Sequence, residues 1–286
     1  MLFSQFCKNN ILIILFVVLG LTFFLFQYLK RIYNNHCHSK SNRIKTDVTE
    51  VVPNINYKMN QPDKVIHLFW TGGYDSTFRL CQILLLEDKA VQPIYIMCGN
   101  TDSDSVLIQR KNQNKELQTM KKIRQKIIKD FPYLAIKFLP THYVINLKKN
   151  STISNTFKDL HYRFHFFPRP GNQYERMARF ASDYPYPIEV GVEKCHIGLD
   201  EATQKHRTGK GHQCQLVQHL PHRYLGLEIF RSFRFPIVHL TKEEMKMNAI
   251  KNNFYYLLKM SWSCWYPSYD GKPCLKCPMC QENIIK

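Results

Sequence analysis

A short glycine-containing turn is the first of two stretches whose residue types and spacing suit chemistry. Residues 71–77 read Thr-Gly-Gly-Tyr-Asp-Ser-Thr, between an apolar run and a segment with apolar residues at helical spacing. This pattern predicts a strand, a tight turn and a helix. Backbone N–H groups and the helix dipole favour an anion at a helix N-terminus, and glycines let the backbone approach that anion closely. The hydroxyl groups add hydrogen-bond donors, and Asp75 is predicted to cap the helix or to orient a magnesium-bound phosphate.

Four cysteines near the C-terminus form the second stretch. Cys264, Cys274, Cys277 and Cys280 follow the spacing C-x9-C-x2-C-x2-C. Four thiolates suit a tetrahedral zinc ion, and an iron–sulfur cluster is the alternative for such soft ligands. Because four cysteine ligands leave no open coordination position, we expect a structural zinc ion. The alternative without a metal is a set of free, redox-active cysteines. The length of the chain and this spacing argue against a disulfide scaffold.

The turn around Gly72 and Gly73 resembles one known nucleotide-binding signature. The chain contains neither G-x-x-x-x-G-K-[ST] nor G-x-G-x-x-G, so the two commonest phosphate loops are excluded. The remaining pattern resembles the S-G-G-x-D-S signature of the PP-loop ATP pyrophosphatases, with Thr71 in place of the first serine. The alternative is an ordinary tight turn between a strand and a helix. The resemblance implies catalytic roles for Asp75 and Ser76. It implies an ATP site formed by Trp70, Thr71, Gly72, Gly73, Tyr74, Asp75, Ser76, Thr77, Phe78, Arg79 and Leu80.

The turn and the cysteines together resemble the 7-cyano-7-deazaguanine synthase family, a branch of the PP-loop enzymes. That family carries S-G-G-x-D-S-T near its start and S-C-[YW] followed by C-x2-C-x2-C at its end. The resemblance covers residues 64–281, and the family's Tyr-Gly before Gln-Arg and its basic residue after the last cysteine are missing here. Looser similarities lie at Gln109-Arg110 with Glu116, at Pro170-Gly171-Asn172 with Ala178 and Ala181, at Gly191-Val192, and at Pro236 with Leu240-Thr241-Lys242-Glu243.

The family resemblance implies an ATP-dependent ligase. The carboxylate of a deazapurine, 7-carboxy-7-deazaguanine, would attack the α-phosphate of ATP to give an acyl-adenylate and pyrophosphate. Ammonia would displace AMP to give an amide, and a second adenylation and dehydration would give the nitrile. The loop would hold the pyrophosphate, and Mg²⁺ would bridge phosphate oxygens. Two alternatives stay open: a PP-loop tRNA-modifying enzyme of the thiolase or lysidine type, and a non-catalytic, membrane-tethered nucleotide-binding protein.

The elements that position these residues alternate along the chain. Alternating strands and helices predict an α/β fold with a three-layer, mostly parallel sheet, which is also the fold that the PP-loop resemblance implies. The ligand crevice of such a sheet lies at the carboxyl ends of its strands. The last predicted helix opens with a capping box at Thr241-Lys242-Glu243-Glu244. Strands are predicted over residues 65–70, 91–98, 134–138, 187–192 and 235–240, and helices over residues 76–86, 112–130 and 241–259.

An apolar segment precedes this α/β part. Residues 11–29 are uncharged, and as a helix they would span about 28 Å, close to the ~30 Å hydrocarbon core of a bilayer. We expect a single transmembrane anchor; the alternative is a signal peptide, but the apolar stretch is long and no small-residue cleavage site follows it. Lys30 and Arg31 come next, so the positive-inside rule places the rest of the chain in the cytoplasm. The expected divisions are an anchor (1–31), a linker (32–62), a PP-loop domain (63–260) and a zinc-binding tail (261–286).

Charge and histidine content bear on the partners. The chain has 40 Lys+Arg and 22 Asp+Glu, a net charge of +18, which suits ATP, nucleic acid or an anionic membrane surface. Of these, ATP together with a small carboxylate and ammonia is favoured over nucleic acid. Residues 193–223 are basic and His-rich, and we expect a loop that covers the substrate or contacts nucleic acid. Asp102 and Asp104 are interpreted as exposed loop acids rather than nucleotide ligands. The alternative for the His-rich segment is a second metal site formed by Cys195, His196, His212 and Cys214.

Overall fold

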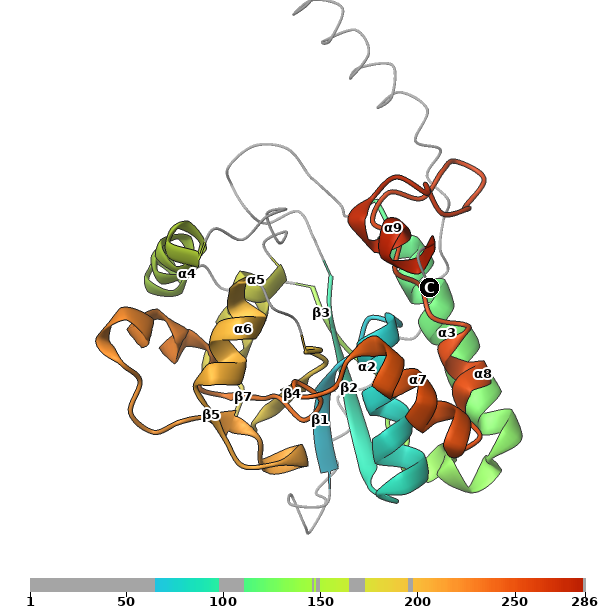
Figure 1. The fold of residues 1–286 in the computed structure, drawn as a ribbon. Coiled ribbons are helices and arrows are strands. Elements are labelled where there is room, and N and C mark those ends of the chain that lie inside the picture. The colour runs from blue at the N-terminus through green and yellow to red at the C-terminus, as the bar shows by residue number, and fades with distance from the viewer. Residues whose placement is uncertain are drawn as a thin grey trace, which may run out of the picture. The chain divides into compact units, whose positions relative to one another are not determined.

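A five-stranded parallel sheet organises the computed structural model, which describes residues 65–97, 111–145, 147, 150–164, 173–194 and 198–284 (Figure 1). The strands run in the order β3-β2-β1-β4-β7, and each neighbouring pair is parallel. The predicted α/β class with a mostly parallel sheet is therefore confirmed. Their bounds are β1 (Val65–Phe69), β2 (Ala90–Ile96), β3 (His142–Val144), β4 (Ile188–Val190) and β7 (Phe233–Arg234). A separate antiparallel ribbon pairs β5 (Arg207–Thr208) with β6 (Gln215–Leu216).

Helices cover both faces of the sheet. The α-helices are α2 (Tyr74–Cys81), α3 (Gln113–Asp130), α4 (Ser151–Phe164), α5 (Gln173–Asp183), α6 (Gly198–Lys205), α7 (Lys242–Lys251), α8 (Tyr255–Leu258) and α9 (Pro278–Ile284). One π-helical turn, η2 (Gln82–Leu86), continues α2. The 3-10 segments are η3 (Pro132–Ile136), η4 (Gly211–Gln213) and η5 (His222–Phe230). The helix predicted over residues 76–86 is thus present as α2 and η2, and the helix predicted over residues 112–130 is α3.

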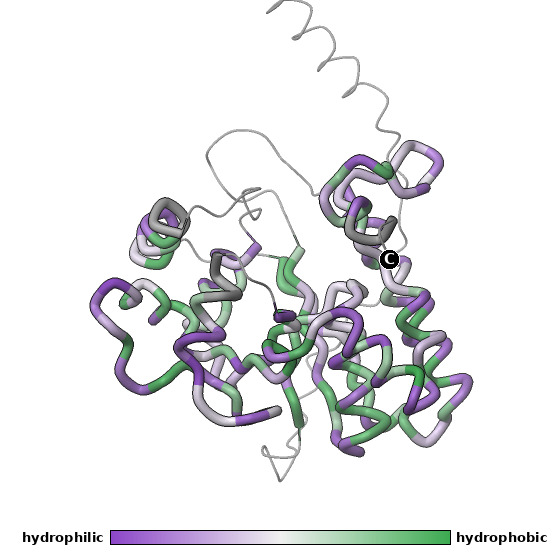
Figure 2. The backbone as a smooth tube through the Cα atoms, viewed as in Figure 1, coloured by the Kyte–Doolittle hydropathy of each residue, from purple (hydrophilic) through white to green (hydrophobic). Residues whose placement is uncertain are grey.

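Two hydrophobic cores lie on opposite faces of the sheet. Ile66 and Leu68 of β1 belong to the core that joins the sheet to α2, α3, α7 and α8. Phe69 belongs to the core that joins it to α4, α5 and η5. This division follows from the geometry of a β-strand, in which successive side chains point to opposite faces of the sheet. Figure 2 shows the resulting concentration of hydrophobic positions in the strands between the two helical layers.

The strand order places a switch point beside β1. The strand pairs with β2 on one side and with β4 on the other, so the chain progresses across the sheet in two opposite directions from this point. In open α/β sheets, ligands bind at such a point, outside the carboxyl ends of the strands. The glycine turn follows β1 directly, and it therefore occupies the position at which the fold class places its ligand site.

The strand predicted over residues 134–138 is wrong. Leu134 and Phe138 are buried, but Ile136 between them is 81% exposed, so the apolar alternation does not mark one buried face. Residues 132–136 form the 3-10 segment η3, with Pro132 in its first turn, where a missing N–H costs nothing. Phe138 makes one isolated parallel bridge to Val91, and the sheet's edge strand is β3, a few residues further on.

The strand predicted over residues 235–240 is also wrong. The fifth strand is β7, and the residues after it form turns, in which Val238 N–H donates to Phe235 O and Leu240 N–H donates to Ile237 O. Pro236 has no N–H to give to a ladder, which explains why the strand stops before it.

The helix predicted over residues 241–259 begins correctly and ends early. Its capping box is confirmed: Thr241 Oγ1 accepts from Glu244 N–H at 3.2 Å, and Thr241 N–H donates to the Glu244 carboxylate at 2.7 Å. However, α7 ends at Lys251, and Asn253 adopts a positive φ of 58° that breaks the helix. The four-residue helix α8 follows it.

Several predicted features lie outside the described residues. Among the described residues, no helix has both the length and the apolar character needed to cross a bilayer. The features outside are the apolar segment 11–29, the linker to residue 62, Asp102, Asp104, Gln109, Arg110, Pro170, Gly171, Asn172, Cys195 and His196.

Candidate functional site

Two glycines shape the turn between β1 and α2. Gly72 has a φ of +72°, a conformation that L-residues rarely adopt, and a Cβ there would lie 3.2 Å from side-chain carbons of Thr119 and Met120 on α3. Gly73 is the N-cap of α2 and has extended backbone angles. A Cβ at Gly73 would lie 3.2 Å from Thr71 Oγ1. Glycine is therefore required at position 72, because the backbone has a positive φ and α3 packs closely against it. Glycine at position 73 lets the turn lie close to the hydroxyl of Thr71.

Hydroxyl groups hold the turn together from inside. Thr71 Oγ1 accepts from Gly73 N–H at 3.3 Å, and Ser76 Oγ donates to Gly73 O at 3.3 Å. Ser76 Oγ also lies 3.5 Å from Thr71 N, within reach of its N–H. Thr77 differs, because it is fully buried and its Oγ1 accepts from the indole N–H of Trp70 at 3.2 Å. Thr71 and Ser76 thus line the turn, whereas Thr77 lies buried beneath it, and its predicted contact with an anion stays a prediction.

The N-terminal end of α2 lies at the switch point of the sheet. Gly73 has no side chain, so the cap predicted for Asp75 does not form, and no side chain caps the helix. Asp75 instead lies within the first turn, where a carboxylate complements the helix dipole. The first backbone N–H groups of a helix have no partner inside the helix. This turn therefore combines backbone donors with a half-buried carboxylate and the hydroxyl of Ser76.

The end of β4 packs directly on the start of α2. A Cβ at Gly191, the residue after β4, would lie 2.8 Å from Ser76 N, 2.9 Å from Ser76 Cα and 3.0 Å from the carbonyl carbon of Asp75. These are backbone atoms, which cannot swing aside as a side chain can. The absence of a side chain at Gly191 thus sets how closely β4 approaches the turn. The sequence indicated Gly191 only through a loose family similarity, because a lone glycine after a strand has no specific local signal.

The cysteine-bearing tail also reaches the turn. Trp262 N–H donates to Gly72 O at 3.0 Å, and Trp262 O lies 3.8 Å from the Cβ position of Gly73. The indole N–H of Trp262 donates in turn to Cys264 O at 2.9 Å. Lys115 of α3 places its ammonium group 4.8 Å from the centre of the indole ring. The turn is therefore enclosed by three segments that are distant in sequence: α3, the end of β4, and the tail.

The side chain of Arg79 is buried and forms ion pairs within the protein. It is 2% exposed, and its guanidinium donates to Glu189 of β4 at 2.6 and 2.9 Å and to Glu87. Burial alone would raise the pKa of Glu189, but hydrogen bonds and charge from His212 and Arg79 hold that pKa below its ordinary value. Arg79 thus does not meet the expectation of direct ATP contact. Trp70, Phe78 and Leu80 are likewise buried in the core beneath the turn.

A buried polar group lies at the start of α3. Glu116 is 6% exposed, and its carboxylate accepts from Tyr95 O–H at 2.7 Å and from Asn112 Nδ2 at 2.9 Å. Tyr95 belongs to β2, so this group ties α3 to the sheet next to β1. The family similarity pointed to Glu116, and the contacts make it a residue that positions α3.

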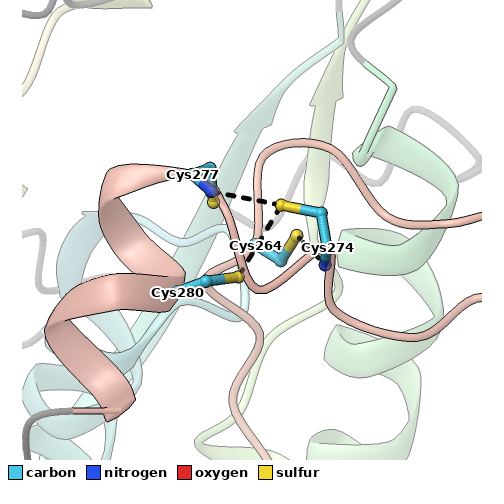
Figure 3. A group of neighbouring side chains, drawn as sticks. All are labelled: Cys264, Cys274, Cys277 and Cys280. Atoms are coloured by element: carbon cyan, nitrogen blue, oxygen red, sulfur yellow. Dashed lines mark hydrogen bonds between the residues drawn. The ribbon is translucent and has the colours of Figure 1, made fainter.

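The four predicted cysteines come together in the tail (Figure 3). Their sulfur atoms all lie within 4.8 Å of one another, and Cys264, Cys277 and Cys280 are buried. Backbone N–H groups point at the sulfurs: Cys274 N donates to Cys264 Sγ at 3.2 Å, and Cys277 N donates to Cys274 Sγ at 3.3 Å. Leu275, inside the first C-x2-C, has a φ of 59°. The cluster could hold a metal ion such as zinc, as the spacing predicted.

The thiol groups differ in their acidity. Backbone N–H donation, first from Lys276 and also from Cys277, lowers the pKa of Cys274 to about 6 despite the opposing effect of desolvation. Burial raises the pKa of Cys264 and raises that of Cys280 to about 12. Four thiolates this close repel one another strongly without a cation. A divalent metal would remove that repulsion, and the N–H donors would stabilise the remaining negative charge.

The described part of the His-rich segment contains no cluster of metal-binding side chains. Among the described residues, the four cysteines of the tail are the one such cluster found. His212 instead lies 3.2 Å from the buried carboxylate of Glu189, and Cys214 is buried. Cys195 and His196 lie outside the described residues, so their part in the predicted site stays a prediction.

Sequence reasoning found the turn and the cysteines, but it missed the pair formed by Arg79 and Glu189. The available signal was an acid inside an otherwise apolar strand, which requires a buried partner.

Comparison with known proteins does not assign the chain to a family. The chain matches no protein-family model, and no curated protein is significantly similar to it.

Proposed function

We propose that the turn at residues 71–76 binds the phosphates of ATP and that the protein is an ATP-dependent adenylating enzyme. The observation that carries the proposal is the position of this turn: a glycine-shaped helix N-terminus at the switch point of a parallel sheet. Gly72 and Gly73 bring backbone close to the ligand, and Ser76 adds a hydroxyl. ATP would be split between its α- and β-phosphates, and the turn would retain the pyrophosphate.

The chemistry required of the protein is positioning and charge neutralisation. A carboxylate that attacks the α-phosphate is already a nucleophile, so no general base is needed. Backbone N–H groups and the dipole of α2 would stabilise charge on the departing pyrophosphate. Asp75 would hold Mg²⁺, which neutralises phosphate charge when bound. Asp75 and Ser76 are accordingly the residues for which we propose catalytic roles.

We propose a deazapurine carboxylate as the acceptor, on the basis of the family resemblance. The substrate would be 7-carboxy-7-deazaguanine or a close relative, and ammonia would be the second substrate. Adenylation of the carboxylate releases pyrophosphate, and ammonia then displaces AMP to give an amide. A second adenylation, followed by loss of the activated oxygen, gives the nitrile. The protein would thus be a C–N ligase in deazapurine synthesis, such as that leading to queuosine.

We propose that the metal in the cysteine cluster is zinc and that its role is structural. All four positions of a tetrahedral ion would be taken by Cys264, Cys274, Cys277 and Cys280. The chain passes from this cluster to Trp262, which is hydrogen-bonded to the turn. The ion would therefore act on the ATP site through the tail, by holding Trp262 in place.

We also propose that residues 11–29 anchor the chain in a membrane, with the α/β part on the cytoplasmic side. Their uncharged apolar length and the cationic pair Lys30 and Arg31 support this. Resistance to extraction from membranes by alkaline carbonate, with protease access from the cytoplasmic side, is the expected result. Complete release by carbonate would reject the anchor without bearing on the catalytic proposal.

The catalytic proposal is tested with purified full chain, ATP, Mg²⁺, ammonium and 7-carboxy-7-deazaguanine. AMP, pyrophosphate and the nitrile are followed by mass spectrometry. The expected result is nitrile formation with about two AMP per product. Asp75→Asn and Ser76→Ala should abolish pyrophosphate release and leave the unfolding midpoint near that of the wild type. Ser182→Ala is the matched control, because this exposed hydroxyl at the end of α5 donates only locally.

Other outcomes select between the alternatives. Pyrophosphate without nitrile would keep the adenylation chemistry and reject the deazapurine acceptor, and tRNA would then be tested as the acceptor. Tight ATP binding without pyrophosphate would identify a non-catalytic nucleotide-binding protein. Unchanged turnover in both loop variants would remove the turn from the mechanism.

A further inference from the structure

A stripe of lysines and glutamines runs along α3 and begins at Lys111, two residues before the helix. Its side chains recur every three or four residues, which places them on one face of a helix. The stripe consists of Lys111, Lys115, Gln118, Lys122, Gln125 and Lys129. Lys115 is partly covered, and the other members are exposed. The part of the stripe inside α3, from Lys115 to Lys129, is about 21 Å long at the helical rise of ~1.5 Å per residue.

Glu116 and Asp130 are the acidic side chains of α3, and neither is a member of the stripe. Glu116 is buried and accepts from Tyr95 and Asn112. Asp130, at the end of the helix, accepts from Lys126 and from the hydroxyl of Tyr256. Asp130 also interacts electrostatically with Lys129, so the part of the stripe without a nearby acid of α3 runs from Lys111 to Gln125. A cationic stripe of this kind attracts a chain of regularly spaced anions.

Other exposed helical surfaces of the described residues are different. On α7, Glu243 lies within 3.5 Å of Lys246. On η5, Glu228 forms an ion pair with Arg231. These surfaces mix the two signs of charge, as an ordinary solvated surface does. On α3 such mixing occurs at the C-terminal end, where Lys126 pairs with Asp130, whereas the part of the stripe from Lys111 to Gln125 has no acidic member.

Aromatic rings continue the stripe beyond the first residues of α3. Lys111 places its ammonium group 5.8 Å from the ring centre of Tyr266, and Lys115 lies over the ring of Trp262. Tyr266 is 54% exposed and Tyr269 is 97% exposed. Exposed rings beside lysines form the usual platform for single-stranded nucleic acid, because bases stack on the rings while phosphates meet the cations.

The stripe and the rings meet at the proposed ATP turn. Thr119, beside Lys115 and Lys122 on the helix surface, and Met120, on the side of α3 away from the stripe, pack close to Gly72, and Trp262 N–H donates a hydrogen bond to Gly72 O. A strand that lies along the stripe and stacks on the tail would therefore pass beside the segments that enclose the turn. α3 and the tail form the nucleic-acid face, defined by the stripe residues together with Tyr266, whose ring lies under the ammonium group of Lys111.

We propose that this nucleic-acid face binds single-stranded nucleic acid, for which a single-stranded RNA serves as the probe below. Glutamines between the lysines offer amide groups to base edges, and Tyr266 offers a stacking surface, whereas insertion into a lipid surface would call for several aliphatic side chains along the stripe. The inference does not depend on the proposed ligase chemistry, since binding needs neither ATP nor a carboxylate substrate.

The test is fluorescence anisotropy of a labelled single-stranded RNA with the full chain, without nucleotide, over a range of salt concentrations. The triple variant Lys111→Gln, Lys122→Gln and Lys129→Gln should bind at least ~10-fold more weakly. Its slope of log affinity against log salt should fall by roughly 2, since each phosphate contact on a single strand contributes about 0.7. Tyr266→Ala should weaken binding about fivefold or more at every salt concentration, because it removes stacking.

A charge-matched control separates this face from the net charge of the protein. The triple variant Lys158→Gln, Lys210→Gln and Arg223→Gln removes three exposed cations from α4, the β5–β6 connection and η5. It should bind RNA within about twofold of the wild type. Equal losses in the two triple variants would overturn the proposal in favour of general charge. If the stripe variant loses binding to phosphatidylserine vesicles but still binds RNA like the wild type, the proposal is overturned and the face is assigned to a membrane surface.

Discussion

The glycine turn and the cysteine cluster are built in opposite ways. The cluster takes all four of its thiols from residues 264–280, and its N–H···S hydrogen bonds come from the same segment. The turn, by contrast, depends on α3, on the end of β4 and on the tail. A site made by side-chain spacing can be identified from one segment, whereas a site made by backbone shape needs the whole fold around it.

Two hydrogen bonds donated by Trp262 link the two regions. Trp262 N–H donates to Gly72 O, and the indole of the same residue donates to Cys264 O. Damage to the cluster should therefore reach the turn, while damage to the turn should leave the cluster intact. The predictions below use this asymmetry, in order of decreasing effect.

The largest effect is expected for Cys277→Ser. Removal of one ligand should abolish the binding of about one metal ion per chain, because structural zinc sites contribute on the order of 10 kcal/mol to the folding of their segment. The tail should melt first, and ATP affinity should fall as Trp262 leaves the turn. Metal content is measured by atomic emission and affinity by calorimetry. Cys214→Ser, outside the cluster, should keep the metal; equal metal in both variants would show that the cluster is not a metal site.

The second effect is expected for Glu189→Gln, which leaves the guanidinium of Arg79 buried with Glu87 as its remaining carboxylate partner. Breaking a buried ion pair costs about 3–5 kcal/mol. The free energy of unfolding, measured in urea, should fall by an amount of this order, while the metal content stays unchanged. The double variant Arg79→Met, Glu189→Leu should recover much of the loss. No recovery would mean that Glu189 acts mainly through His212 rather than through Arg79.

The third effect is expected for Gly191→Ala. The new methyl group would meet backbone atoms of Asp75 and Ser76, so β4 and α2 must move apart, at a cost of about 1–3 kcal/mol. ATP affinity should fall by about tenfold or more, because the N-terminus of α2 shifts. Gly211→Ala is the control: its φ of +51° makes alanine strained, but no atom lies within 4 Å of the added Cβ. That control should lose some stability and keep its ATP affinity.

These contrasts also explain how far the sequence could predict the structure. The turn, the cysteine cluster and the capping box at Thr241 each have a local signature, and each was located correctly. Leu134, Ile136 and Phe138 suggested a strand because they are apolar at every second position, but Ile136 is exposed and Pro132 starts a 3-10 turn. Local alternation cannot tell a strand from a short helical turn when the segment is only a few residues long.

The long-range supports of the turn were the part that local patterns could not supply. Nothing near Arg79 in the sequence indicates that its partner is Glu189, 110 residues later. Similarly, Gly191 and Trp262 are important only because the fold brings them to Gly72, Asp75 and Ser76. Their roles follow from the strand order, in which β4 lies next to β1, and strand order is not encoded in any single segment.

The smallest effect is expected for Thr71→Ser, which tests whether the threonine matters beyond its hydroxyl. Serine keeps the oxygen that accepts from Gly73 N–H, so the ATP affinity should stay within about twofold and the stability within about 0.5 kcal/mol. Thr71→Val keeps the shape but removes the acceptor, and the loss of one hydrogen bond should cost about 1 kcal/mol. If valine binds ATP as well as threonine does, the turn is held by its long-range contacts alone. If serine already weakens binding, the methyl group of Thr71 has a packing role that the serine of the PP-loop signature cannot provide.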